Sequence, residues 1–360
     1  MQILHIAEPF ELEAGGVLPE LHIGYHTYGT LSSETTRVVW VCHALTGNSD
    51  AADWWAGLIG PGRLLDPEQY FIVCANNLGS CYGSTGPGSI DSQTGEAYQA
   101  NFPEVTVRDM VRAHRLLARH LGIGAIYLAL GGSMGGQQVL EWAIMEPERL
   151  EHIALLASNA VHSPWGIAFN ETQRMAILAD ETLGTAHPEA GRKGLEAARA
   201  IAMLSYRSYE AYALRQSESD PQKIGDYRAA SYQRYQGYKL WKRFNPWSYI
   251  ALSKAMDSHH IGRGRADIPI VLSGVKSKTL VIGISSDLLF PALEQELLAR
   301  YIPGARLEVI HSSFGHDGFL VEFEPISALL GALLATGDAM ALQHSSERAL
   351  PRALPGSEIF

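Results

Sequence analysis

Short apolar runs alternate with longer helical patterns in two separate blocks of the sequence. The apolar runs are rich in β-branched residues and predict buried strands, whereas the segments between them carry apolar side chains at helical spacing. This alternation is typical of a parallel sheet with helices on both faces, so we predict an α/β fold with a mostly parallel central sheet. The predicted strands are 37–42, 70–75, 125–130, 153–158, 279–284 and 306–310, and the predicted core helices are 107–121, 136–145, 293–301 and 319–334.

The pattern changes between the two blocks. From about 162 to 273 the strand-like runs largely disappear, and the segment is rich in Ala, Arg, Tyr, Gln and Ser at helical spacing. Residues 194–212 predict one helix and residues 221–238 predict another. Because this insertion is much longer than an ordinary loop, we expect it to form a helical lid over the sheet. The predicted organisation is a core of residues 1–161 and 274–335, a lid of residues 162–273, and a poorly ordered or surface-bound tail of residues 336–360.

Composition narrows the class of protein. The 360 residues are 46% hydrophobic and 18% charged, as in an ordinary globular protein. The net charge of −10 argues against a general nucleic-acid-binding protein, because neutralising phosphates needs clustered Lys and Arg. The sequence contains no signal-peptide pattern and no apolar stretch of membrane-spanning length, and its three cysteines lack zinc-ligand spacing. We therefore expect a cytoplasmic, metal-free protein that binds neither nucleic acid nor membrane.

The predicted strand 125–130 runs directly into G-x-S-x-G at residues 131–135. In a nucleophile elbow, this sequence makes a sharp strand-to-helix turn that lifts the serine hydroxyl out of the backbone. Glycine suits such a turn, because a Cβ at Gly131 or Gly135 would meet the neighbouring strand or helix. The motif is common by itself, but a strand before it and a helix after it make Ser133 a candidate nucleophile for acyl transfer.

A serine nucleophile needs a base, and the base needs an acid that orients it. In this arrangement the acid precedes the histidine, and both follow strands near the C-terminal end of the sheet. Asp287 stands after strand 279–284, and His316 stands in the loop after strand 306–310. We predict that Ser133, Asp287 and His316 form a catalytic triad. Two alternatives stay open: Asp287 as only a cap of the next helix, and His311, nearer the strand end, as the base.

A tetrahedral intermediate needs two backbone N–H groups that donate to its oxyanion. One is expected from Met134, which follows the nucleophile, and the other from the loop after an early strand. Strand 37–42 leads into the loop 43–47, where we choose Leu45 from its position. The sequence therefore predicts an oxyanion hole made by the amides of Leu45 and Met134.

Five segments carry a more specific signal: HALTG at 43–47, ANNLGSCYGSTGP at 75–87, GGSMGG at 131–136, SDLLFP at 286–291 and GHDGF at 315–319. Together they strongly resemble the homoserine O-acetyltransferase family. The resemblance implies an α/β-hydrolase fold with an inserted helical lid. It also implies that an acyl group passes from acyl-CoA to L-homoserine by a ping-pong mechanism in methionine biosynthesis. On this basis we expect acetyl-CoA as a substrate, no permanently bound cofactor, and a homodimer formed through the lid.

The resemblance also implies residues that bind the acceptor. Residues 194–207 are similar to the family segment whose arginine holds the homoserine carboxylate, which assigns this role to Arg199, with Tyr206 nearby. A planar guanidinium suits the role because it can donate two parallel hydrogen bonds to a carboxylate. Asp317, next to the predicted base, would hold the substrate ammonium. The alternatives are an ordinary exposed arginine at position 199 and a loop-capping aspartate at position 317.

Other functions compete for the same residues. A transferase must hold its acceptor in place and keep water out, whereas a carboxylester hydrolase of the same fold needs neither. A homoserine O-succinyltransferase would need a further basic group for the distal carboxylate of its donor, and the sequence does not locate one. A catalytically inactive binding protein is expected to have lost a triad residue, and none is missing. Acetyl transfer is therefore the main prediction.

Overall fold

The structure is a computed structural model and describes residues 1–32 and 36–347, with side chains up to residue 335. The strands of its main sheet are β1 (Gln2–Ile6), β4 (Leu21–Tyr28), β5 (Val38–Cys42), β6 (Phe71–Ala75), β7 (Ile126–Gly132), β8 (Leu150–Leu156), β9 (Lys278–Ile284) and β10 (Arg306–Ile310). Their order across the sheet is β1-β4-β6-β5-β7-β8-β9-β10. Strands β5 to β10 pair in parallel, and β4 pairs antiparallel with both β1 and β6. The predicted α/β fold with a mostly parallel sheet is confirmed.

All six predicted strands are present, and their ends shift by at most three residues. The N-terminal strands are additions that the hydrophobic pattern does not predict. Polar residues and Gly24 interrupt the apolar run of β4, and most of β1 is exposed. A separate two-stranded sheet pairs β2 (Phe10–Glu11) with β3 (Val17–Leu18).

Helices cover both faces of the sheet, and side chains alternate between these faces along each strand. In β5, Trp40 packs edge-to-face on Trp142 with ring centroids 5.0 Å apart, whereas Val39 belongs to the buried cluster on the opposite face. The core is therefore divided into two layers by the sheet. The helices outside the lid are α1 (Ala51–Trp54), α2 (Val107–His120), α3 (Met134–Met145), α10 (Ala292–Tyr301), α11 (Gly318–Val321) and α12 (Phe323–Glu347), with 3-10 turns η1 (Gln99–Asn101) and η2 (Gly315–Asp317).

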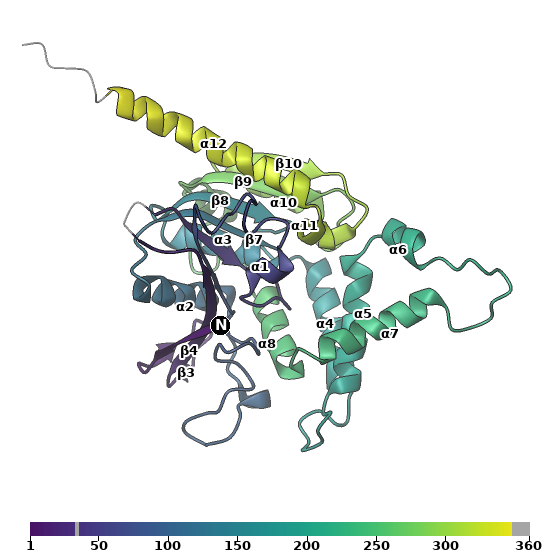
Figure 1. The fold of residues 1–360 in the computed structure, drawn as a ribbon. Coiled ribbons are helices and arrows are strands. Elements are labelled where there is room, and N and C mark those ends of the chain that lie inside the picture. The colour runs from purple at the N-terminus through teal and green to yellow at the C-terminus, as the bar shows by residue number, and fades with distance from the viewer. Residues whose placement is uncertain (33–35, 348–360) are drawn as a thin grey trace, which may run out of the picture.

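The lid lies between β8 and β9 in the chain, and its helices α4 to α7 project to one side of the sheet (Figure 1). Its helices are α4 (Pro164–Leu178), α5 (Arg192–Tyr206), α6 (Tyr209–Gln216), α7 (Arg228–Trp241), α8 (Pro246–Asp257) and α9 (Ile268–Ser273).

Two predicted lid helices differ from the structure. Residues 194–212 form two helices, because Arg207 is extended and Ser208 starts α6 by accepting the N–H of Ala211 at 3.0 Å. The predicted helix 221–238 begins only at Arg228 and ends at Trp241. Gly225 and Asp226 have positive φ angles of 103° and 46°, which a right-handed helix excludes.

The C-terminal helix also differs from the prediction over 319–334. It is broken after Val321, because in a continuous helix the ring of Pro325 would clash with the Val321 carbonyl. After the break, α12 continues to Glu347, so the first part of the predicted tail, residues 336–347, is helical, which the sequence pattern did not predict. Strong helix formers such as Ala, Met, Leu and Gln in this stretch favour the extension. The rest of the predicted tail, 348–360, lies outside the described residues.

Within the described ranges, no single helix has the length and apolar character needed to cross a membrane. Only the segments 315–321 and 323–335 satisfy that test together, and they meet at a bend of 67°.

Candidate active site

Ser133 sits at the carboxyl end of β7, immediately before α3, in a strained backbone conformation. Its φ and ψ are 57° and −126°, values that cost a non-glycine residue about 1–3 kcal/mol. Two contacts hold this turn: the Ser133 N–H donates to Leu156 O at 2.9 Å, and the Ser158 hydroxyl donates to Ser133 O at 2.9 Å. The predicted elbow is therefore present, with the serine hydroxyl at the end of the sheet.

The glycines of the elbow allow α3 to approach β5. A Cβ on Gly135 would lie 2.1 Å from Cys42 O, and one on Gly131 would lie 2.5 Å from the Gly135 carbonyl carbon. Both distances are far below van der Waals contact. The predicted reason for glycine at these two positions is confirmed.

Asp287 and His316 come together at the same end of the sheet, after β9 and β10. His316 Nδ1 lies 2.7 Å from Asp287 Oδ2, while Asp287 Oδ1 accepts the N–H groups of Leu289 and Phe290 at 2.8 and 2.9 Å. The aspartate therefore stabilises its own turn and orients the histidine, whereas the alternative role as a cap of the next helix is wrong, because α10 begins after Pro291 without a side-chain cap. With Nδ1 directed at the carboxylate, Nε2 is the ring nitrogen left to exchange a proton.

The imidazole of His316 is packed as well as hydrogen-bonded. Phe290 stacks on it with centroids 5.0 Å apart and planes at 16°, and Phe319 contacts it edge-on at 5.2 Å. Both His316 and Asp287 are at most 5% exposed. His311, the rival base, is exposed at the end of β10. The structure thus brings His316, and not His311, to the buried acid.

The loop after β5 forms a tight turn, in which the Gly47 N–H donates to Ala44 O at 2.9 Å. Leu45 is the second residue of this turn, so its amide takes no part in the turn's own hydrogen bond. Met134 is the first residue of α3, and its amide has no partner within the helix. Both positions therefore leave an N–H available to an oxyanion.

A buried histidine at the start of this loop, His43, fixes the loop through hydrogen bonds. Burial lowers the pKa of His43 to about 4, so the ring is neutral at physiological pH and its Nε2 accepts the Asn77 N–H at 3.2 Å. The side chain of Gln138, on α3, donates to His43 O at 3.3 Å. The loop is thereby tied to both the segment 75–87 and the elbow helix.

A lid arginine that was not predicted from the sequence also binds the loop 43–47. Arg243 Nη1 donates to Thr46 O at 2.6 Å and to the Tyr82 hydroxyl at 2.8 Å. Tyr82 is itself anchored, because Asn76 Nδ2 donates to its carbonyl at 2.6 Å. Nothing in the spacing of the sequence points to Arg243, since 197 positions separate it from Thr46.

The residues predicted to bind the acceptor lie around His316. Arg199, on α5, lies 5.2 Å from the centre of the Tyr206 ring, and that ring lies 5.8 Å from the His316 ring. Burial raises the pKa of Tyr206, so its hydroxyl stays protonated. Within the part of the chain that the structure describes, no carboxylate lies within ion-pair distance of Arg199.

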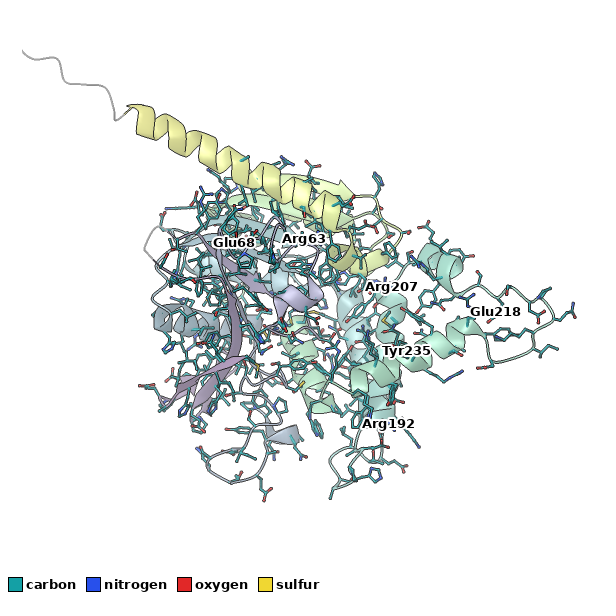
Figure 2. All side chains as sticks on the ribbon, in the orientation of Figure 1. Arg63, Glu68, Arg192, Arg207, Glu218 and Tyr235 are labelled. Atoms are coloured by element: carbon teal, nitrogen blue, oxygen red, sulfur yellow. The ribbon has the colours of Figure 1, made fainter. Side chains whose placement is uncertain are left out.

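Asp317 has a partner that the sequence did not predict. Its Oδ2 lies 3.0 Å from Nε of Arg207, which sits where the lid meets the loop 311–317 that carries the candidate base His316, named the catalytic loop for that reason (Figure 2). Near the proposed base there are thus a positive group, Arg199, which the Tyr206 ring separates from His316, and a negative group, Asp317, its neighbour in the chain; an amino acid carries the complementary charges.

One group of side chains among the described residues has the geometry to hold a cation. The ligand atoms of His5, Glu20 and His22 all lie within 4.8 Å of one another, and the two histidines face each other across β1 and β4. This group is at the opposite end of the strand order from β9 and β10. It therefore has no part in the chemistry of the serine site.

Comparison with known proteins agrees with this geometry. Residues 37–323 match the family model described as the alpha/beta hydrolase fold. A homoserine O-acetyltransferase of Cyclobacterium marinum is 49% identical over 329 residues, which cover 91% of this chain and 93% of that protein. The crystal structure of homoserine O-acetyltransferase from Bacillus anthracis is similar with a TM-score of 0.84 at 25% identity, covering 93% of this chain and 98% of that one. The acetyl esterase MekB is similar with a TM-score of 0.81 at 26% identity, covering 93% and 96%. This chain therefore belongs to the homoserine O-acetyltransferase family, acyltransferases built on the α/β-hydrolase fold.

Proposed function

We propose that this chain transfers an acetyl group from acetyl-CoA to the hydroxyl of L-homoserine through an acetyl-Ser133 intermediate. The observation that carries the proposal is the pairing of a buried Asp287–His316 couple with two charged side chains beside it. Arg199 suits the carboxylate of an amino acid, and Asp317 suits its ammonium. An ester hydrolase has no use for this pair of charges.

In the first half-reaction, His316 Nε2 takes the proton of Ser133 Oγ as the oxygen attacks the thioester carbon. The amides of Leu45 and Met134 stabilise the oxyanion of the tetrahedral intermediate. Its collapse breaks the C–S bond, and His316 returns the proton to the departing thiolate. Ser133 is left as an acetyl ester.

In the second half-reaction, His316 removes the proton from the homoserine hydroxyl, whose oxygen attacks the acetyl carbon. Collapse of the second intermediate releases O-acetylhomoserine, and the proton passes from His316 back to Ser133 Oγ. The acceptor must outcompete water at this stage. Arg199, Tyr206 and Asp317 would give homoserine that advantage by holding its hydroxyl at the ester.

The chain is further proposed to act as a homodimer through its lid, in the cytoplasm. Large apolar side chains are exposed on the mutually packed lid helices α4, α5 and α7, and a second lid would cover them, which supports the dimer; they are Met175, Leu178, Leu204 and Tyr235. The free thiols of Cys42, Cys74 and Cys81 suit a reducing compartment. Light scattering tests the dimer, and a monomeric mass at micromolar concentration would contradict it.

The function is tested by incubating the protein with homoserine and either acetyl-CoA or succinyl-CoA. Thiol release and O-acylhomoserine are measured together, with Ser133→Ala as the control. We expect O-acetylhomoserine in step with thiol release, and no product from the control. Thiol release that is independent of homoserine, with no acylated amino acid, would favour an esterase like MekB. Preference for the succinyl donor would favour the O-succinyltransferase alternative.

A further inference from the structure

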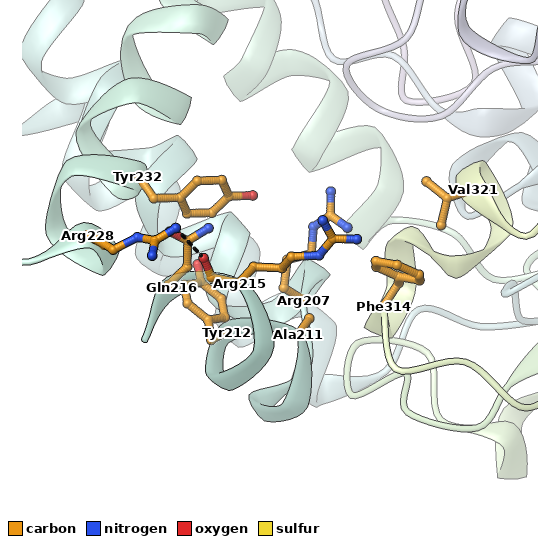
Figure 3. Close-up of a pocket in the computed structure, with 9 residues that line it drawn as sticks. All are labelled: Arg207, Ala211, Tyr212, Arg215, Gln216, Arg228, Tyr232, Phe314 and Val321. Atoms are coloured by element: carbon orange, nitrogen blue, oxygen red, sulfur yellow. Dashed lines mark hydrogen bonds between the residues drawn. The ribbon is translucent and has the colours of Figure 1, made fainter. Parts of the chain in front are cut away.

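A cleft rich in arginine lies between the lid helices α6 and α7 and the catalytic loop (Figure 3). Its volume is about 570 Å³. The residues that matter for its chemistry are Arg207, Arg215, Arg228, Tyr212, Tyr232 and Phe314. Arg215 and Arg228 have no role in the acyl-transfer steps proposed above for Ser133 and His316.

The positive charge of the cleft is only partly balanced. Arg207 pairs with Asp317, but no carboxylate among the described residues lies within ion-pair distance of Arg215 or Arg228. The nearby acid Glu218 is occupied by the Lys223 ammonium at 3.1 Å and by the backbone N–H of Arg228.

The Arg228 guanidinium makes only long contacts with the protein. It donates to Arg215 O at 3.4 Å and to Ser217 O at 3.5 Å, distances at the limit of a hydrogen bond. Most of its donors, and those of the exposed Arg215, therefore remain open to a ligand. Planar guanidinium groups with open donors are suited to phosphate.

Two tyrosines complete the cleft. Tyr212 and Tyr232 meet edge-to-face with ring centroids 5.9 Å apart and planes at 85°. The Tyr212 hydroxyl is buried without a hydrogen-bond partner among the described residues, and burial raises its pKa to about 12. It is thus a protonated, unused donor in the field of Arg207 and Arg199, next to aromatic surface on which a planar ring can pack.

The position of the cleft links it to the reaction. Phe314, on its wall, is two residues from His316, and the Arg207 side chain lies over the Phe314 ring at 6.0 Å. A ligand held here would have one end next to the catalytic loop. The whole chain carries a net charge of −10, so a polyanionic substrate needs a local concentration of positive charge to bind.

We propose that this cleft binds the nucleotide end of the CoA donor. Arg215 and Arg228 hold its phosphates, Tyr212 and Tyr232 contact the adenine, and the pantetheine arm passes Phe314 toward Ser133. This inference rests on the proposed function, because it assumes an acyl-CoA substrate.

The test compares donors with and without phosphates. In an Arg215→Gln/Arg228→Gln variant, we expect the KM for acetyl-CoA to rise at least tenfold, with the KM for S-acetylpantetheine unchanged. Titration calorimetry on the Ser133→Ala background should show at least tenfold weaker binding of CoA and of adenosine 3′,5′-bisphosphate. Arg234→Gln is the matched control, since Arg234 lies on the same helix α7 but pairs with Asp226 at 2.9 Å.

Unchanged CoA affinity in the double variant would overturn the inference, and so would an equal loss with S-acetylpantetheine. Failure of the proposed function has a different signature. In that case the unsubstituted protein forms no O-acetylhomoserine from either donor, while the arginine dependence of CoA binding can still be measured.

Discussion

Arg207 Nε lies 3.0 Å from Asp317 Oδ2, so the carboxylate proposed to hold the substrate ammonium is already oriented by a lid arginine. The two side chains are 25% and 12% exposed, which places the pair at the inner edge of the lid. Because a carboxylate has two oxygens, Oδ1 remains available to an ammonium group. The pair therefore connects the lid to the loop that carries His316.

Asp317→Asn should weaken acceptor binding without slowing the first half-reaction. Losing a charged hydrogen-bond partner costs about 1.5–3 kcal/mol, so we expect the KM for homoserine to rise at least tenfold. Stopped-flow thiol release without homoserine should keep its burst rate. A burst that slows in parallel with the steady-state rate would show that Asp317 acts on His316 instead.

Arg199→Gln should remove recognition of the acceptor carboxylate. We expect a rise of at least tenfold in the KM for homoserine, and little change for an amino-alcohol acceptor that lacks the carboxylate. Arg192→Gln is the control on the same helix, since Arg192 pairs with Glu189 and Glu196 at the surface. Equal losses with both acceptors would argue against a carboxylate contact.

Arg243→Gln should loosen the loop that carries Leu45. Because Arg243 acts through Thr46 and Tyr82, we expect kcat to fall roughly tenfold, less than when an oxyanion donor is removed outright. KM values for both substrates should change little, which separates positioning from substrate binding. Arg243→Lys keeps a positively charged donor nitrogen and should recover part of kcat; a variant whose KM alone changes would contradict this role.

Gly135→Ala should destabilise the protein as well as the site. The new Cβ would lie 2.1 Å from Cys42 O, and relieving such a clash costs about 1–3 kcal/mol. Urea unfolding gives the change in free energy. Gly124→Ala is the control, because a Cβ there meets nothing within 4 Å, and similar losses in both variants would rule out the clash.

Acid should destabilise the fold through its buried histidines. Burial lowers the pKa values of His43 and His162 to about 4, and those of His114 and His259 to about 3. The pKa of a histidine in the unfolded chain is near 6.5. Below that pH these histidines are therefore protonated in the unfolded chain but remain neutral in the folded chain. Stability is therefore full above about pH 6.5 and falls toward pH 4, by about 1.4 kcal/mol per pH unit for each histidine.

His114→Leu tests this explanation directly. Neither ring nitrogen of His114 has a hydrogen-bond partner among the described residues, so leucine leaves no partner unsatisfied. Between pH 6 and pH 5, the change in unfolding free energy per pH unit should be smaller than in the unsubstituted chain by about 1.4 kcal/mol, which corresponds to one proton. The exposed His120, on the same helix, provides the control His120→Leu. An unchanged slope in His114→Leu would show that another group takes up the proton.

Much of the fold was predictable because local patterns reflect burial. The six parallel strands are apolar over most of their length, since a parallel sheet is covered on both faces. Strand β4 escaped prediction because it lies toward the sheet edge with polar side chains in its sequence. The break at Arg207 was not predicted because it depends on one capping serine, Ser208, which helical spacing does not reveal. The late start of α7 was not predicted because it depends on the positive φ angles of Gly225 and Asp226.

For the site, strand order and the chemistry of a serine nucleophile led from the sequence to Ser133, Asp287 and His316, and the structure pairs the last two at 2.7 Å. The sequence also determined that glycine must flank the serine. Only the tertiary structure shows that Arg207 pairs with Asp317 and that Arg243 binds Thr46 O. The same holds for the arginines of α6 and α7, which line one cleft. These contacts join residues far apart in the chain, and only packing of the lid against the sheet brings their side chains within reach.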